Sequence, residues 1–162
     1  MSKKIKVGDK APDFTLLREW TGEPGESVTL SDKLEEGPVV LAFYPADFST
    51  PCRTELKTFR DSMEEYKKMG VNVLAISVDG IFSHAAFKEQ NNFQFPLLSD
   101  WQKEVIEEYG VVWEDLAGMK NVANRAVFVI DTDGKVTYTW RSEDPTNMPP
   151  FDDVKKAVKK LQ

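Results

Sequence analysis

The chain has 162 residues, 41% of them hydrophobic and 30% charged, which fits a single globular domain spanning residues 1–162. Its formal net charge of −6 at pH 7 argues against a general affinity for nucleic acid. One histidine and one cysteine are too few for a zinc site, so we expect neither a metal nor another cofactor.

The sequence also limits where the protein is expected to work. The N-terminal segment carries charge but lacks the apolar stretch of a secretory signal. The longest apolar run, residues 39–44, is too short to span a bilayer. A single cysteine can form no disulfide within the chain, which favours a reducing compartment. We therefore expect a cytoplasmic protein with no membrane partner and no nucleic-acid partner.

The first half of the chain alternates between extended and helical patterns. Short extended segments around residues 13–17 and 28–30 are separated by a stretch rich in Gly and Pro. Residues 39–44 form a continuous β-branched and aromatic run, which is typical of a strand buried on both faces. From Cys52, apolar residues recur at helical spacing until Gly70, which predicts a helix beginning close to the cysteine.

The second half continues this alternation. The further predicted elements are a buried strand at residues 71–78, a helix at 83–92 capped by Ser83, a short connector at 95–98, a helix at 99–109, a hairpin formed by strands 126–131 and 135–140, and a closing helix at about 151–161. Strands that alternate with helices and then end in a hairpin predict an α/β fold, in which helices cover both faces of a mixed central sheet.

Cys52 stands at the predicted junction between the strand at 39–44 and the helix that follows, directly after Pro51. A helix N-terminus offers free N–H groups and a partial positive charge, which favour a thiolate and lower its pKa. Open α/β sheets commonly place their sites at the C-terminal end of such a central strand. A buried structural cysteine is the alternative, because Cys52 also lies on the apolar stripe of its helix. The junction favours a reactive thiol.

The residues around Cys52 resemble the active-site loop of the peroxiredoxin family. That loop has the form Pro-x-x-x-Thr/Ser-x-x-Cys, usually followed closely by Thr-Glu, and Pro45, Ser49 and Cys52 occupy the matching positions. The segment that begins at Asn124-Arg125 resembles the strand from which the family supplies an arginine. Further matching segments, which extend the resemblance over nearly the whole chain, are residues 8–14, 75–79 and 95–100.

The resemblance implies a thioredoxin-like fold with an N-terminal β extension, and an enzyme that reduces hydrogen peroxide and organic hydroperoxides. Cys52 would then be the nucleophile. Arg125 would hold the thiolate and polarise the peroxide, while the Ser49 hydroxyl can both donate and accept. Pro45 would shield the sulfur from water. Glu55 is expected to hold the arginine in place, although a first-turn acid that merely complements the helix dipole is the alternative.

One departure from many family members concerns the second cysteine that captures the oxidised one. Lys57 stands where some members place it, and the chain has no other cysteine. The sulfenic acid formed on Cys52 must therefore be reduced by an external thiol, either a low-molecular-weight thiol or a thioredoxin- or glutaredoxin-like protein. The chain is similar to the single-cysteine type, near the alkyl hydroperoxide reductase E and bacterioferritin-comigratory (peroxiredoxin Q-like) branches. Because many members pair, we expect a homodimer.

Parts of the sequence are also compatible with functions other than a peroxidase. A thioredoxin-like disulfide reductase fits the fold but needs a Cys-x-x-Cys pair, which this chain lacks. A peroxide sensor or redox-dependent chaperone that relays oxidation to a partner protein stays open as an alternative. The only histidine, His84, is expected on the surface of its helix, because thiolate chemistry with an arginine needs no general base. The tryptophans, expected in the core or an interface, are Trp20, Trp101, Trp113 and Trp140.

Overall fold

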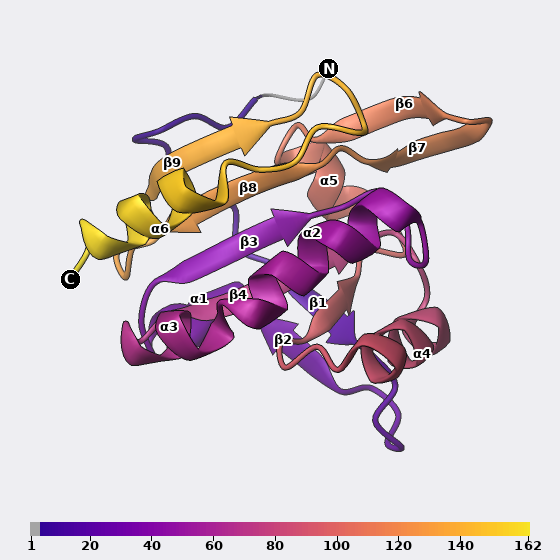
Figure 1. Ribbon diagram of the computed structural model, residues 1–162, viewed down its shortest axis with the longest axis horizontal. Helices are drawn as coiled ribbons and strands as arrows, with labels where there is room; N and C mark the ends of the chain where they lie inside the picture. The colour runs from indigo at the N-terminus through magenta and orange to yellow at the C-terminus, as the bar shows by residue number, and fades with distance from the viewer. Residues whose placement is uncertain (1–3) are drawn as a thin grey trace.

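Figure 1 shows the computed structural model, in which helices lie on both sides of a twisted sheet. The structure describes residues 4–162. Residues 1–3, part of the N-terminal segment that is not expected to be a secretory signal, lie outside the described residues. Within residues 4–162, every helix is too short or too polar to cross a bilayer.

A seven-stranded mixed sheet forms the centre, with the strand order β2-β1-β5-β4-β3-β8-β9. The strands are β1 (Thr15–Arg18), β2 (Ser27–Thr29), β3 (Val39–Phe43), β4 (Asn72–Ser77), β5 (Leu97–Ser99), β8 (Ala126–Ile130) and β9 (Val136–Arg141). β3, β4 and β5 run parallel, whereas β8 pairs antiparallel with β3 and β1 pairs antiparallel with β5. The hairpin of β1 and β2 thus extends one edge of the sheet, as the resemblance implied, and the expected α/β fold is confirmed.

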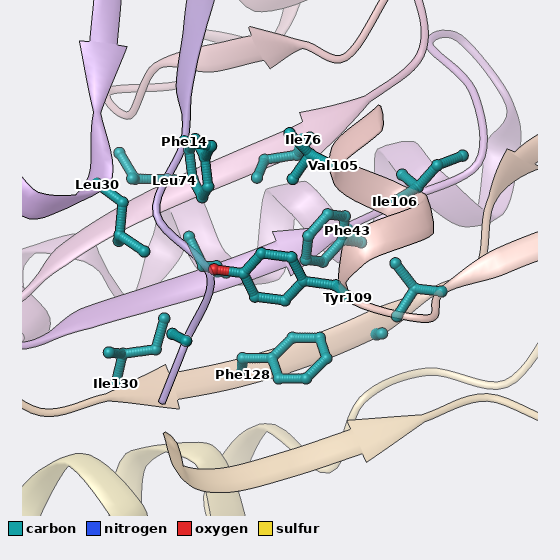
Figure 2. Packing of buried hydrophobic residues seen from close by; sticks show 14 of the residues in the cluster. Phe14, Leu30, Phe43, Leu74, Ile76, Val105, Ile106, Tyr109, Phe128 and Ile130 are labelled. Atoms are coloured by element: carbon teal, nitrogen blue, oxygen red, sulfur yellow. The ribbon is translucent and has the colours of Figure 1, made fainter. Parts of the chain in front are cut away.

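β3 lies between β4 and β8 and is buried along its whole length. Because successive strand residues point to opposite faces, Leu41 and Phe43 contribute to one core and Val40 and Ala42 to the other. In the core that contains Phe43, the ring of Tyr109 lies beside the rings of Phe43 and Phe128, as Figure 2 shows. The continuous apolar run of the sequence is therefore explained by a central strand covered on both sides.

The helices divide between the two cores. The face with Val40 is covered by α2 (Thr50–Asp61), α3 (Met63–Lys68), α4 (Ile81–Asn91) and α6 (Phe151–Lys159), and the opposite face by α1 (Leu30–Leu34) and α5 (Glu104–Glu108). Tyr109 follows α5, and its hydroxyl donates a hydrogen bond to the Pro12 carbonyl at 2.6 Å. This bond attaches the N-terminal segment to the core that contains Phe43.

Two predicted elements differ from the structure in their type or extent. β5 contains Leu97 and Leu98, which were expected in a connector, and Ser99, which was expected to begin a helix. These residues form a strand because their backbone pairs with β4 on one side and β1 on the other. The helix expected at 99–109 begins only at Glu104, after Lys103. The Asp100 carboxylate lies before the helix and accepts hydrogen bonds from the N–H groups of Val105 and Ile106 in its first turn.

Other differences concern boundaries and a missed hairpin. The strands β6 (Val112–Leu116) and β7 (Met119–Ala123) were not predicted, because most of their residues are at least partly exposed and show no buried apolar run. The helix expected from Cys52 to Gly70 is divided into α2 and α3 at Ser62. α4 begins at Ile81 after Gly80, so the prediction that Ser83 caps it was wrong.

Candidate active site

Cys52 lies in the first turn of α2, just beyond the C-terminal end of β3, and is completely buried. Ser49 is the N-cap of this helix, and its Oγ accepts a hydrogen bond from the Cys52 N–H at 3.3 Å. Pro51 occupies the first turn, where the N–H that proline lacks would have no partner within the helix. The local sequence therefore builds a rigid helix entrance with the thiol inside it.

Arg125 approaches the thiol from a distant part of the chain. It immediately precedes β8, and the antiparallel register places Ala126 opposite Phe43, so that Arg125 lies beside the loop that follows β3. Its Nη1 lies 3.6 Å from Cys52 Sγ and donates a hydrogen bond to Glu55 Oε1 at 2.7 Å. Sheet pairing thus brings together two residues that lie far apart in sequence.

The guanidinium is held on more than one side. Nη2 of Arg125 donates to the Pro145 carbonyl at 2.8 Å, in the loop between β9 and α6. The side chains of Arg125 and Glu55 are both essentially buried, at 1% and 0% exposure. Pro45, also buried, begins the loop that leads to Ser49 and Cys52. The structure therefore brings Ser49, Cys52, Arg125 and Glu55 into contact, and Pro45 begins the same loop, while their chemical roles stay predictions.

The surroundings of the sulfur act on its acidity in opposite directions. Burial raises the pKa of the Cys52 thiol above its ordinary value, and the nearby carboxylate of Glu55 acts in the same direction. The Arg125 guanidinium, a hydrogen bond from Ser49 and the backbone N–H of Ala46 each lower this pKa, but less than burial raises it. The expectation of a lowered pKa was therefore wrong for this geometry, because the loss of water around the thiol outweighs the effects of Arg125, Ser49 and Ala46.

Glu55 is itself strongly affected by burial. Its environment raises the pKa of the carboxyl from an ordinary 4.5 to about 7, against the opposing attraction of Arg125. Oε1 accepts the hydrogen bond from Arg125, whereas Oε2 has no hydrogen-bond partner among the described residues. An oxygen that has lost water without gaining a donor favours the protonated carboxyl. Glu55 is thus expected to change its charge near neutral pH.

Glu55 should leave a signature in the pH dependence of stability. Because its folded pKa lies above its unfolded pKa, the folded state binds more protons between pH 4.5 and 7, and stability falls as pH rises through that interval. The shift corresponds to a fall of about 3 kcal/mol in the free energy of unfolding. Urea unfolding from pH 4.5 to 8 should show this fall for the wild type but not for Glu55→Gln. Parallel curves for the two proteins would contradict it.

His84 differs most from its prediction. It is completely buried rather than exposed on its helix. Its Nδ1 lies 2.7 Å from Oδ2 of Asp47, and its Nε2 lies 3.0 Å from the Leu98 carbonyl oxygen. His84, Phe87 and Asn91 are the buried residues of α4, and their spacing of three and four is that of one helix face. This spacing was the signal in the sequence that could have identified His84 as buried, whereas nothing local pointed to Asp47.

The four tryptophans differ in their burial. Trp101 is 68% exposed and lies over Gly80, and Trp20, 37% exposed, packs against Phe82. Trp113 and Trp140 are half-buried. The core prediction was therefore wrong for the two exposed rings, since they cover surface loops rather than fill the interior, while the prediction of an interface stays untested.

Comparisons with known proteins agree with this geometry. A family model described as the AhpC/TSA family matches residues 7–139. The chain is 41% identical over 138 residues to a peroxiredoxin bcp of Coxiella burnetii, which covers 84% of this chain and 88% of that protein. It is 39% identical over 140 residues to the chloroplastic peroxiredoxin Q of Oryza sativa subsp. japonica, which covers 86% of this chain but 61% of the plant protein.

Solved structures give the same result. The crystal structure of peroxidoxin BcpB from Mycobacterium tuberculosis has a TM-score of 0.81 and 36% sequence identity, with 97% of this chain and 96% of that chain covered. The peroxiredoxin-like protein from Aquifex aeolicus has a TM-score of 0.84 and 30% identity, with 99% and 90% covered. Both similarities extend over nearly the whole chain.

Proposed function

Since the chain belongs to the AhpC/TSA family and is a peroxiredoxin, a thiol-dependent peroxidase, we propose that Cys52 is the nucleophile that attacks the peroxide. The observation that carries this proposal is the buried Arg125 guanidinium, 3.6 Å from the Cys52 sulfur. A fixed positive charge at this distance favours the thiolate over the thiol. Ser49 and Pro45 are proposed to complete the site.

The proposed reaction is an in-line displacement at oxygen. A sulfur electron pair of Cys52 forms a bond to one peroxide oxygen, while the O–O bond breaks and its electron pair leaves with the other oxygen. Cys52 is oxidised to a sulfenic acid and the peroxide is reduced. The leaving oxygen accepts a proton, so that the net reaction transfers the thiol proton to the departing water or alcohol.

Each group near the sulfur has a physical task in this step. Arg125 cannot lose its proton, so it can stabilise negative charge first on sulfur and then on the leaving oxygen. The Ser49 hydroxyl and the Ala46 N–H supply fixed dipoles beside the sulfur. Because burial alone would keep the thiol protonated, these donors are required to make it reactive.

The regeneration step is proposed to need another molecule. Peroxiredoxins use thiol reductants, and this chain has no second cysteine that could capture the sulfenic acid. We propose that a low-molecular-weight thiol or a thioredoxin- or glutaredoxin-like protein attacks the sulfenic sulfur of Cys52, so that a mixed disulfide forms and water leaves. A second thiol then reduces this disulfide and releases the Cys52 thiol. We further propose that residues 1–162 act as one domain, that the protein forms a homodimer, and that it works in the cytoplasm.

Ser49 provides a test of the donor set. Ser49→Ala removes the helix cap and a donor to the sulfur, and should slow the reaction with peroxide about tenfold and lower stability by about 1 kcal/mol. Ser49→Thr keeps the hydroxyl and should restore both properties. Stopped-flow rates and urea unfolding of the two variants provide the comparison. Equal peroxide rates for alanine and threonine would exclude a role for the hydroxyl.

The proposed function is tested by mass spectrometry after one equivalent of hydrogen peroxide, with peptide mapping because the chain also has five methionines. We expect one added oxygen on Cys52 and its removal by an added thiol, with continued turnover as more peroxide is supplied. Oxygen found only on methionines would contradict the proposal. Oxidation that stops after a single turnover and proceeds only to a mixed disulfide with one protein would favour the sensor instead.

A further inference from the structure

The loop between β3 and α2 is tied to the rest of the fold through a buried aspartate. The side chain of Asp47 is 1% exposed. Its Oδ1 accepts a hydrogen bond from the Tyr44 hydroxyl at 2.6 Å, and its Oδ2 accepts one from the Ser83 hydroxyl at 2.8 Å. Oδ2 also lies 2.7 Å from Nδ1 of His84. Both carboxylate oxygens are therefore engaged, and two of the partners belong to α4.

His84 links this aspartate to the sheet. The Leu98 carbonyl, 3.0 Å from Nε2, can only accept, so Nε2 carries a hydrogen. Nδ1 lies 2.7 Å from Oδ2 of the Asp47 carboxylate, which is a hydrogen-bond distance. The ring thus spans from the loop to β5, with both nitrogens occupied and no exposed surface.

A second attachment acts on the backbone of the same residue. The Asp47 N–H donates to Oδ2 of Asp79 at 2.9 Å, and the Ser77 hydroxyl holds the same oxygen at 2.5 Å. The ligand atoms of Asp47, Asp79 and His84 lie within 4.8 Å of one another, but the hydrogen bonds above already engage them. This arrangement favours a structural link over a metal site. We call the link from the loop through Asp47 and His84 to β5 the tether.

The position of Asp47 gives the tether a consequence for the thiol. Asp47 directly follows Ala46 and stands two residues before Ser49. Ala46 and Ser49 both lower the pKa of Cys52, and Ser49 Oγ accepts a hydrogen bond from the Cys52 N–H. Phe48, which lies between Asp47 and Ser49, has a φ of 67°, and this conformation is unfavourable for a residue with a bulky side chain. A loop with this strain needs outside contacts to keep one shape.

We propose that Asp47 and His84 are positioning residues, which hold the loop in the conformation in which Ser49 caps the first turn of α2 at Cys52. They act through this loop and touch neither the sulfur nor the peroxide. This inference rests on the proposed role of Cys52. The inference goes beyond that role because it makes the reactivity of Cys52 depend on the only histidine, His84, and on Asp47 in the loop.

The test uses the variants His84→Phe and Asp47→Asn, each compared with Asn91→Ala. The Asn91 amide is a buried group on the same helix, but it donates to the Phe87 carbonyl at 2.9 Å and lies outside the tether. Loss of the tether should slow the reaction with hydrogen peroxide about 10- to 100-fold, because a small displacement of reacting groups is costly. It should also move the pH midpoint of Cys52 alkylation by iodoacetamide upward. Asn91→Ala should lower stability and leave both readouts unchanged.

Alkylation makes the tether testable apart from the peroxidase reaction. An upward shift in both tether variants supports the inference even if wild-type Cys52 reacts with peroxide no faster than free cysteine, a result that would remove the proposed function alone. Should His84→Phe fail to fold, the nearly isosteric Asp47→Asn carries the test. Rates and alkylation profiles of the tether variants that equal those of Asn91→Ala would overturn the inference and leave the pair a structural role.

Discussion

Replacing Cys52 with serine is expected to abolish peroxide consumption. A neutral hydroxyl is a far weaker nucleophile than a thiolate, and the chain has no other cysteine that could take over. Serine is slightly smaller than cysteine and can still accept the hydrogen bond that Arg125 directs at this position, so the fold should persist. Peroxide consumption in the presence of an added thiol and circular dichroism together provide the measurement.

The Ser49→Thr variant is the matched control for this experiment, because it lies in the same loop and keeps the thiol. It should consume peroxide at close to the wild-type rate. Activity that survives in Cys52→Ser above the background of the added thiol would contradict the assignment of the nucleophile, provided that the variant is folded.

Replacing Arg125 with methionine is expected to slow the reaction with peroxide about 100- to 1,000-fold. Methionine fills a similar volume without the charge that lowers the pKa of Cys52. The pKa of the thiol should therefore rise further above its already raised value, and the donor to the leaving oxygen is lost. The pH dependence of iodoacetamide alkylation measures the first effect, and stopped-flow mixing with hydrogen peroxide measures the second.

Stability must be separated from reactivity in this variant. Removing Arg125 leaves the buried carboxyl of Glu55 without its only hydrogen-bond donor among the described residues, which is destabilising in itself. The double variant Arg125→Met/Glu55→Gln removes both charges and should recover much of the stability while staying slow. An alkylation profile that does not move in either variant would exclude the proposed role of the arginine.

The fold was predictable where burial follows the sequence locally. Residues 39–44 form an unbroken apolar run, and β3 occupies Val39–Phe43. β5 was missed because its three residues become a strand only through pairing with β4 and β1, which are remote in sequence. The hairpin of β6 and β7 was missed because exposed strands leave no apolar pattern to recognise.

The site was predictable to the extent that the family motif names residues. Pro45, Ser49 and Cys52 lie in one short loop, and the resemblance added Arg125 from a distant strand. Its proximity to the sulfur depends on the antiparallel register of β3 and β8, which no local pattern contains. Whether these residues act as proposed stays a prediction.

Two properties of the site depend on tertiary structure and were therefore predicted wrongly or missed. The sequence places Cys52 at a helix N-terminus, which lowers a thiol pKa, but the complete burial that raises it arises only when the sheet and helices assemble. The contact of His84 with Asp47 likewise joins α4 to a loop 37 residues earlier in the chain. The sequence indicates the chemistry of a residue more readily than its surroundings.

The central claim is tested most directly by the second-order rate constant for hydrogen peroxide with the reduced protein, measured by stopped-flow mixing at pH 7 beside free cysteine. We expect the protein to react at least about 100-fold faster, because fixed donors stabilise the charge that moves from sulfur to oxygen. A rate constant equal to or below that of free cysteine would contradict the claim that the surroundings of Cys52 are built to break the peroxide bond.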